Sequence, residues 1–368
     1  MPKILVAMSG GVDSSVAAAL LKEQGHELCG VTLKLYENED IGVCSQKTCC
    51  SLADVEDARR VAARMGFRHV VFSYADEFRH DVISRFALEY AAGRTPNPCI
   101  DCNRFIKFPR MLYRARLLGM DGIATGHYAR VEFDEVSGRW LLKKARDLSK
   151  DQTYVLYALT QDELAHTRFP LGGLLKSEVR KLAEERNLVN ARKPDSQDIC
   201  FVPNGDYAGF LERVMGVGAP EGDYIDSEGN VIGRHKGHHR YTIGQRKGLG
   251  VGFGEPRYVI QKDAMRDTVT LGGKEELLSS GLIVKDVNWI SIDQLLEPMS
   301  VTVKTRYHQP EAAAVLHPHK DGVQVLFNKP QASAAPGQAA VFYIGDTVVG
   351  GGIIDIIDRK GYDSYENT

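Results

Sequence analysis

The chain has 368 residues, of which 43% are hydrophobic and 26% are charged, and its formal net charge is −2. These values are typical of a globular protein with a large buried core and room for two or three domains. No stretch reaches the length of a transmembrane span, and the N-terminus lacks the basic and apolar regions of a signal peptide. We therefore expect a cytoplasmic protein that has no membrane partner. The nearly balanced charge gives no global indication of nucleic-acid binding, so only local basic segments can indicate it.

The first predicted elements are a strand, a glycine-rich turn and a helix. Apolar residues predict a strand over Ile4–Met8, and helical periodicity follows over Ser14–Gln24. The turn between them, SGGVDSS (residues 9–15), would point backbone N–H groups at a phosphate near the start of the helix. Its serine hydroxyls would add donors, and Asp13 can hold a Mg²⁺ ion that bridges phosphate oxygens. The turn lacks the lysine of a Walker A loop, so it predicts a different kind of phosphate site.

Strands and helices continue to alternate up to about residue 200. Further strands are predicted over Leu28–Leu35, His69–Phe72 and Gly122–Thr125. The remaining helices are predicted over Leu52–Met65, Glu77–Ala92, Phe105–Leu118, Gln161–His166 and Lys176–Asn187. This order predicts a doubly wound parallel sheet that binds its ligands at the carboxyl ends of the strands.

The character of the sequence changes after about Phe201. Residues 216–256 are rich in glycine, and β-type runs separated by turn signals dominate from Leu282 onward. These runs cover Ser300–Tyr307, Ala312–His317, Val323–Phe327, Ala339–Ile344 and Thr347–Ile357. We therefore predict an α/β domain over residues 1–205, a small central domain over 206–278 and a C-terminal antiparallel β-barrel over 279–368.

The seven cysteines are an odd number, which in the cytoplasm indicates catalysis or metal binding rather than a disulfide framework. Cys99 and Cys102 form a C-x-x-C motif that we expect in a loop stiffened by Pro96 and Pro98. Cys200 lies in a second proline-containing segment, and both segments suit the carboxyl edge of the sheet. The polar neighbours of Cys102 argue against its burial, and a nearby Arg or Lys would favour the nucleophilic thiolate.

Eight motifs carry a resemblance to a known family. The first is similar to the PP-loop of ATP pyrophosphatases, which transfer AMP to a carbonyl oxygen. In chain order, the eight together resemble the bacterial and mitochondrial tRNA-specific 2-thiouridylases, and the similarity runs from Lys3 to about Asp355. The motifs are SGGVDSS (9–15), RTPNPCIDCN (94–103), TGHYAR (125–130), KDQTYVLY (150–157), DSQDICF (195–201), GQRKGLG (244–250), KTRYHQP (304–310) and PGQAAVFY (336–343).

The resemblance implies an ATP-dependent sulfurtransferase. It would replace the C2 oxygen of the wobble uridine with sulfur in the anticodon loops of tRNAs for Lys, Glu and Gln, with a sulfur-relay protein or a cysteine desulfurase as the donor. Cys102 matches the nucleophile, and Cys200 matches the cysteine that carries the persulfide sulfur. The positions that match ATP contacts are Ala7, Met8, Ser9, Gly10, Gly11, Val12, Asp13, Ser14, Leu33 and Gly126. Those that match tRNA contacts are Asn97, Pro98 and Cys99 at the target base, and His127, Lys150, Asp151, Gln152, Arg306, Tyr307 and Gln338 elsewhere.

One position departs from the family pattern. Many relatives carry an aspartate where this chain has Cys99. Cys99, Cys102 and Cys200 could then hold a 4Fe–4S cluster, because thiolates are the usual cluster ligands. A persulfide mechanism and a cluster mechanism therefore both stay open. A further group of cysteines lacks an adjacent fourth ligand for zinc, and we interpret these residues as incidental thiols: Cys44, Cys49 and Cys50.

A basic segment lies in the central region. Residues 234–254 contain no carboxylate, whereas a solvated charged face normally mixes both signs. The segment therefore predicts contacts with RNA phosphates, beside Tyr241. Its basic residues are Arg234, His235, Lys236, His238, His239, Arg240, Arg246 and Lys247.

Three other functions compete with this prediction. A PP-loop ligase that forms AMP while acting on a small molecule would need neither the paired cysteine segments nor the basic segment. A tRNA-binding module without catalysis would not need Asp13, Cys102 and Cys200. A dithiol oxidoreductase of the thioredoxin type would need the C-x-x-C at a helix N-terminus, whereas the helical pattern begins only at Phe105.

Overall fold

The computed structural model describes residues 1–37, 52–194, 199–202, 205–215, 220–250, 252, 254–332 and 334–358. The cysteine group at 44–50 and the first four residues of the motif at 195–201 lie outside the described residues. Among the described residues, none of the helices combines the length and the apolar character needed to cross a membrane.

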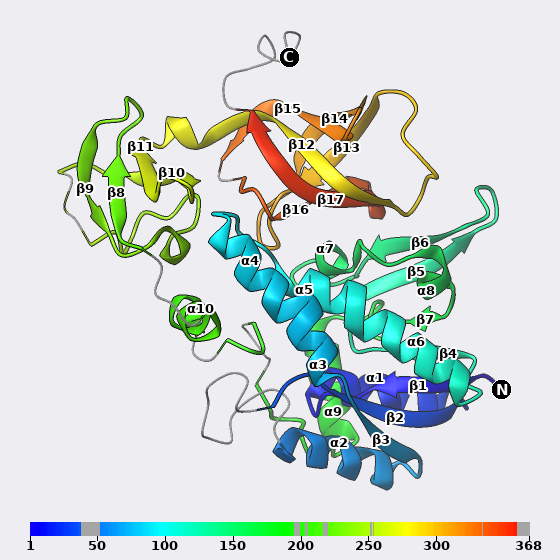
Figure 1. Cartoon of the computed structure of the whole chain (residues 1–368). Helices are drawn as coiled ribbons and strands as arrows, with labels where there is room; N and C mark the ends of the chain where they lie inside the picture. Colours follow the sequence, from blue (N-terminus) through cyan, green and yellow to red (C-terminus); the bar gives the residue numbers. More distant parts are fainter. Residues whose placement is uncertain are drawn as a thin grey trace.

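The N-terminal half contains the predicted parallel sheet (Figure 1). Its strands lie in the order β3-β2-β1-β4-β7, and every neighbouring pair is parallel. The bounds are β1 (Lys3–Ala7), β2 (Glu27–Lys34), β3 (Arg68–Ser73), β4 (Gly122–Ala124) and β7 (Thr167–Arg168). The doubly wound α/β architecture is thus confirmed.

Side chains that alternate along β1 bury opposite faces of this sheet. Ile4 and Val6 pack with α1 (Val12–Glu23) and α2 (Leu52–Arg64), whereas Leu5 packs on the other face with α6 (Phe108–Leu117). The cluster around Leu5 also contains barrel residues such as Val341 and Tyr343. The parallel sheet and the C-terminal strands therefore share one continuous core.

Two long helical runs lie between the parallel sheet and the C-terminal strands (Figure 1). The first comprises α3 (Ala75–Phe78), a π-helical segment (Arg79–Ser84) and α4 (Arg85–Ala91). The second comprises α5 (Pro98–Asp101), a π-helical turn η3 (Cys102–Lys107) and α6. The helices α7 (Thr153–Leu156), α8 (Gln161–Ala165) and α9 (Lys176–Glu185) follow.

The prediction of a loop at the C-x-x-C motif is wrong, because a helix already begins at Pro98. Asn97 is the N-cap, and its side-chain Oδ1 accepts the Cys99 N–H at 3.1 Å. Pro98 occupies the first helical turn, where the missing N–H costs nothing. The proline that we interpreted as stiffening a loop therefore starts a helix.

The central region forms a small four-stranded sheet in the order β10-β11-β8-β9, which follows α10 (Tyr207–Met215). Its strands are β8 (Gly222–Ile225), β9 (Val231–His235), β10 (Tyr258–Asp263) and β11 (Thr268–Gly272). Tyr224, Val259, Val269 and Leu271 are fully buried and form its core. The small central domain of the predicted architecture is confirmed.

The C-terminal strands form a closed antiparallel barrel of six strands, as predicted. The order is β12-β15-β14-β13-β16-β17, and pairing of β12 with β17 closes it. The hairpin β5 (Ala129–Asp134) and β6 (Arg139–Lys144) extends this sheet through the pair Thr347–Lys143, which the sequence did not predict. The barrel strands are β12 (Leu278–Trp289), β13 (Met299–Lys304), β14 (Ala312–His319), β15 (Gly322–Ala332), β16 (Ala339–Ile344) and β17 (Thr347–Asp358).

Candidate nucleotide and sulfur-transfer site

The glycine-rich turn joins the carboxyl end of β1 to α1. Gly10 has φ +74°, and a Cβ there would lie 2.3 Å from the Asp54 carbonyl oxygen, so only glycine fits. The hydroxyls of Ser14 and Ser15 both donate to the Gly11 carbonyl, at 3.1 and 3.0 Å. These two serines therefore shape the turn, and the expectation that the serine hydroxyls also serve a phosphate stays a prediction. Ser9 is the exposed one of the three.

Residues far along the chain hold the same turn. The Asn190 Nδ2 donates to the carbonyls of Gly10 and Gly11, at 2.9 and 3.1 Å, and to the Ser15 hydroxyl at 2.8 Å. The Lys193 Nζ donates to the Gly10 carbonyl at 3.2 Å and forms ion pairs with two carboxylates of α2, Asp54 and Asp57. Sequence reasoning missed Asn190, because nothing in its local sequence signals a contact 180 residues away.

Asp13 lies in the first turn of α1 and is engaged by two side chains that the sequence did not single out. Its carboxylate accepts the Lys176 Nζ at 2.7 and 2.8 Å and the Tyr128 hydroxyl at 2.9 Å. A single carboxylate fits a Mg²⁺ ion that is held mainly by phosphate oxygens and water. Such an ion would have to share this carboxylate with Lys176.

The two remaining nucleotide positions lie beside the turn. A Cβ on Gly126 would approach the Ser14 nitrogen to 2.7 Å, so the segment after β4 packs directly on the start of α1. Leu33 lies near the carboxyl end of β2 and packs against both the core cluster of the sheet and the cluster that contains Cys102. The structure thus brings Gly126 to the turn and connects Leu33 with the cysteine segment.

The thiols of the C-x-x-C motif differ in exposure. Cys99 is exposed, whereas Cys102 is only 8% exposed and belongs to a hydrophobic cluster, so the expectation of an accessible Cys102 is wrong. Burial raises the pKa of Cys102, and partial desolvation together with the neighbouring Cys102 thiol raises the pKa of Cys99. The positive charge of Lys107 lowers both pKa values, but by less than the other effects raise them. Both groups are therefore thiols at neutral pH, contrary to the expected thiolate.

Cys200 reaches the same hydrophobic cluster from its own segment. It packs against the cluster of Cys102, and its carbonyl accepts the Tyr36 hydroxyl at 2.8 Å. The adjacent Phe201 contacts the rings of Phe78 and Phe86, with centroids 5.5 Å away in each case. The predicted association of the two cysteine segments thus has a structural basis in this aromatic cluster.

A metal cluster does not fit these side chains as they lie. Within the described parts of the chain, no three Cys, His, Asp or Glu side chains are grouped so that they could hold a metal ion. Cys99, Cys102 and Cys200 are all described, and they are not assembled as a ligand set. These three cysteines therefore do not form an iron–sulfur site in this arrangement.

Barrel residues that match tRNA contacts hold the cysteine segment in place. The Gln338 Nε2 donates to the Thr95 and Pro96 carbonyls, at 2.9 and 3.4 Å, and the Pro336 carbonyl accepts the Thr95 N–H at 2.8 Å. Arg306 donates to the Ile243 carbonyl at 2.7 Å and so joins the barrel to the central sheet. Tyr307 contacts the Tyr154 ring, with centroids 6.1 Å apart.

The predicted tRNA contacts in the α/β part are also engaged internally. The His127 Nδ1 and the Thr125 hydroxyl form a hydrogen bond of 2.7 Å, and burial keeps the pKa of His127 well below its usual value. Asp151 is buried and accepts the Ala145 N–H, while Gln152 Oε1 accepts the Tyr128 N–H, both at 2.9 Å. The neighbouring Lys150 is partly exposed, and Pro98 is buried behind its cap residue Asn97.

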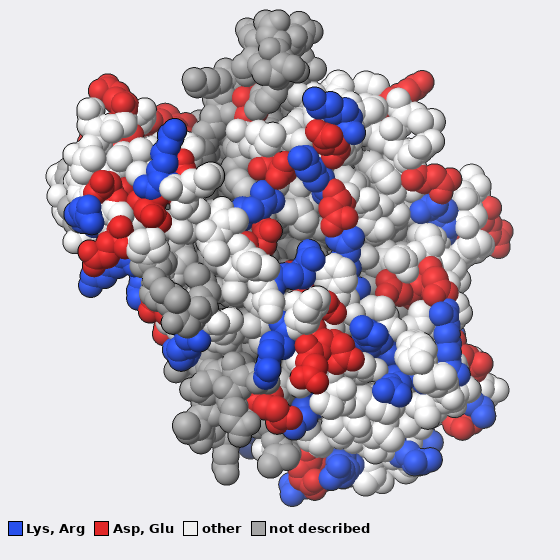
Figure 2. Space-filling model, in the orientation of Figure 1, with Lys and Arg blue, Asp and Glu red and all other residues white. Residues whose placement is uncertain are grey.

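The central basic segment is less exposed than predicted. Its three histidines, 235, 238 and 239, are buried, and His239 bonds Glu212 of α10 at 3.2 Å. Arg240 also pairs with Glu212, and Arg234 pairs with Asp223 at 3.0 Å. Carboxylates outside the segment thus neutralise part of it, and Figure 2 shows basic and acidic residues interspersed over the visible face. Lys236, Arg246 and Lys247 pair with no carboxylate among the described residues.

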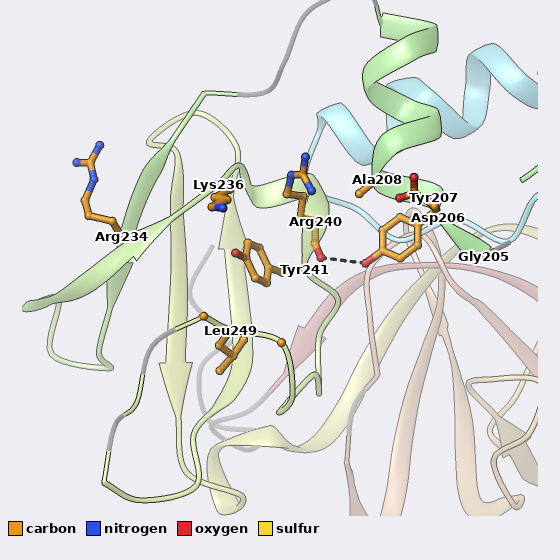
Figure 3. Close-up of a pocket in the computed structure, with 11 residues that line it drawn as sticks. Gly205, Asp206, Tyr207, Ala208, Arg234, Lys236, Arg240, Tyr241 and Leu249 are labelled. Carbon is orange, nitrogen blue, oxygen red and sulfur yellow. Dashed lines mark hydrogen bonds between the residues drawn. The ribbon is translucent and has the colours of Figure 1, made fainter. Parts of the chain in front are cut away.

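A pocket of about 430 Å³ opens beside these residues. Arg234 of β9 and the residues Lys236, Arg240 and Tyr241 that follow β9 line it, and Tyr207 lines it from α10 (Figure 3). The Tyr207 hydroxyl donates to the Arg240 carbonyl at 2.9 Å, and Figure 3 shows Arg234 pointing away from the other side chains. The Tyr207 ring stacks on the ring of Tyr90 in α4, and the two ring centroids are 5.5 Å apart. The pocket therefore adjoins the helix that precedes the cysteine segment.

The parallel sheet, the PP-type turn at its carboxyl edge and the paired cysteine segments define a nucleotide-binding α/β enzyme with a sulfur-handling site. Three family models match in chain order: a tRNA methyl transferase HUP domain over residues 2–204, a tRNA methyl transferase PRC-barrel domain over 208–273 and an aminomethyltransferase β-barrel domain over 279–354.

Close relatives identify the family. The chain is 51% identical to a tRNA-specific 2-thiouridylase of Halothermothrix orenii over 96% of this chain and 99% of that protein. It is 50% identical to the enzyme of the same name from Acetivibrio thermocellus, with the same two coverages. Among solved structures, it is similar to a 4-thiouridine synthetase–RNA complex with bound ATP at a TM-score of only 0.37 and 17% identity, over 58% of this chain and 50% of that one. The chain belongs to the tRNA-specific 2-thiouridylase family, whose members are tRNA sulfurtransferases.

Proposed function

We propose that this enzyme thiolates C2 of the wobble uridine in tRNAs for Lys, Glu and Gln, with ATP as the activating substrate. One observation carries the proposal: Leu33 packs on the cluster of Cys102 from the strand next to β1, which ends in the phosphate-binding turn. A nucleotide at the turn and a uridine at the cysteine segment would then be neighbours. The cytoplasmic location expected from the sequence stays a prediction.

The first step would be adenylation of the uridine. The C2 carbonyl of uracil is urea-like and a poor electrophile. Attack of its oxygen on the α-phosphorus of ATP releases pyrophosphate and turns that oxygen into part of a good leaving group, AMP. The N–H groups of the turn and the dipole of α1 would bind the phosphates. A Mg²⁺ ion at Asp13 would neutralise charge that develops on the departing pyrophosphate.

The second step would transfer sulfur. The terminal sulfur of a Cys200 persulfide attacks C2, and AMP leaves. After Cys102 loses its proton, its thiolate attacks the Cys200 Sγ, which breaks the S–S bond, releases the 2-thiouridine and forms a Cys102–Cys200 disulfide. An external thiol reductant must reduce this disulfide before the next turnover, and a relay protein or cysteine desulfurase would restore the persulfide.

RNA would bind across the cysteine helix, the barrel and the central sheet. A base at the anticodon can leave its stack more easily than one in a duplex. The exposed Cys99 and the cap residue Asn97 would meet the target base. Lys236, Arg246 and Lys247 would contact phosphates away from the target base.

A ligase that adenylates a small molecule is the alternative. Incubation of the enzyme with ATP, a persulfide donor and unmodified tRNA tests the two functions directly. We expect release of AMP and pyrophosphate only when tRNA is present, together with exchange of one oxygen for sulfur at the wobble uridine by mass spectrometry. Release of AMP without tRNA, or unchanged tRNA after turnover, would contradict the proposal.

A further inference from the structure

The phosphate-binding turn has no lysine of its own, but the fold supplies one. Lys176 is the first residue of α9, and its Nζ contacts both carboxylate oxygens of Asp13, at 2.7 and 2.8 Å. Its side chain is 13% exposed, compared with 32% for Asp13. The ammonium therefore lies behind the carboxylate, at the first turn of α1, where the turn would bind phosphates.

We propose that Lys176 is a phosphate-binding residue of the ATP site and that Asp13 positions it before the nucleotide arrives. The proposal rests on the ATP-dependent function proposed above. In the absence of ATP, Asp13 neutralises the lysine. When the phosphates occupy the turn, Lys176 would contact the β- and γ-phosphate oxygens that leave as pyrophosphate. Lysine is a compact point charge on a flexible stem, which suits such an exchange of partners.

The surrounding contacts fix the backbone of Lys176, and its ammonium also lies 5.7 Å from the centroid of the Tyr128 ring. The Lys176 N–H donates to Asp147 at 2.9 Å, and the Leu175 N–H donates to Glu178 at 2.7 Å, so the start of α9 is tied down. The Tyr128 hydroxyl donates to Asp13 at 2.9 Å and would keep that carboxylate hydrogen-bonded when the ammonium turns to a phosphate.

The opposing interpretation is a structural ion pair between α1 and α9. The same two helices carry such a pair at their other ends, where Arg186 contacts both carboxylate oxygens of Glu23, at 2.6 and 2.7 Å. Arg186→Gln is therefore a matched control. It removes a cation from the same helix pair but not from the phosphate-binding turn.

The experiment measures binding of ATP, pyrophosphate and AMP to full-length wild type, Lys176→Gln, Lys176→Arg and Arg186→Gln by calorimetry. We expect Lys176→Gln to weaken ATP and pyrophosphate binding on the order of tenfold or more, the usual effect of losing a charged hydrogen bond. AMP binding should change by no more than about twofold, because AMP lacks the phosphates concerned. Lys176→Arg should retain part of the affinity, and Arg186→Gln should bind all three ligands as wild type does.

Equal losses for AMP and ATP, or no loss for either, would overturn the proposal. If Lys176→Gln does not fold, amine acylation of the wild type followed by mass spectrometry replaces it: pyrophosphate should protect Lys176 and AMP should not, and equal labelling overturns the proposal. These readouts need no turnover. A wild type that binds ATP but does not thiolate tRNA would contradict the proposed function while leaving the role of Lys176 supported.

Discussion

Gln338 of the barrel donates a hydrogen bond to the carbonyl of Thr95, four residues before Cys99, at 2.9 Å. A Cβ on the neighbouring Gly337 would lie 2.9 Å from the Thr95 nitrogen, so the two segments meet without an intervening side chain. The barrel thus positions the segment that leads into the cysteine helix.

Replacement of Gln338 by Ala should therefore impair sulfur transfer more than nucleotide binding. We expect a lower kcat for thiolation, unchanged ATP affinity and a loss of about 1 kcal/mol in the free energy of unfolding, as for one hydrogen bond. Gln331→Ala is the control, because the Gln331 side chain bonds only the nearby Lys329 carbonyl among the contacts described for it. Equal kinetic effects of the two substitutions would argue against a positioning role for Gln338.

Asp13→Ala should abolish formation of AMP and leave tRNA affinity nearly unchanged, because Asp13 faces Lys176 and the phosphate-binding turn. The measurement is AMP release alongside a filter-binding titration with tRNA. A parallel decrease of both would show that Asp13 acts on the RNA or on the fold.

The exposed cations between β9 and β10 should contribute to RNA affinity by contacting phosphate groups. Lys236→Gln and the double change Arg246→Ala, Lys247→Ala should each weaken tRNA binding and flatten its salt dependence, by about one unit of log–log slope per lost contact. Arg116→Gln offers a control of equal charge, since Arg116 pairs with Asp162 on the α/β part. Unchanged slopes would remove these residues from the RNA interface.

Lys262 should make the stability of the central sheet depend on pH. Burial lowers its pKa to about 7, and its Nζ lies 5.5 Å from the Tyr90 ring centroid. Because the folded-state pKa is below the unfolded value, the unfolded chain binds more protons between these two pKa values, and stability rises with pH there. Lys262→Met should raise the free energy of unfolding at pH 6 by about 1 kcal/mol or more.

This gain should shrink as the pH rises from about 7 and disappear only above about pH 10.5, where the wild-type lysine is neutral in both states. Denaturant melts at several pH values provide the measurement, with the exposed Lys274→Met as the control. A constant difference between Lys262→Met and wild type across this range would contradict the assigned pKa.

The cysteines should act as thiols and not as ligands of a metal. We expect the protein purified without oxygen to contain far less than one iron per chain. Cys102→Ser and Cys200→Ser should stop thiolation, whereas Cys99→Asp should keep activity with a persulfide donor. Stoichiometric iron and acid-labile sulfide, lost in Cys99→Asp together with activity, would instead establish a cluster mechanism.

Local patterns predicted the parallel sheet and the glycine-rich turn between β1 and α1, because apolar periodicity and the Gly10-Gly11 pair act over a few residues. The same reasoning failed at Pro98, where a proline that commonly ends regular structure begins a helix after the cap Asn97. Whether a proline breaks or starts a helix depends on the cap that precedes it.

Contacts between distant segments could not be predicted from one sequence. Asn190 bonds the Gly10 carbonyl, and Lys176 bonds Asp13, only because α9 and the segment after it pack beside α1. The burial of His239 likewise depends on Glu212 of another element. A basic segment can be recognised in the sequence, but the sequence does not indicate which of its charges are paired with carboxylates in the fold.

The β5–β6 hairpin precedes Cys200 in the chain, yet its hydrogen bonds extend the sheet of the C-terminal barrel. A gene fragment that stops near residue 205 would therefore leave β6 with an unprotected edge and the core around Leu5 without Val341 and Tyr343. Such a fragment should aggregate on expression, and transfer of the α/β domain into another protein should require the C-terminal barrel as well.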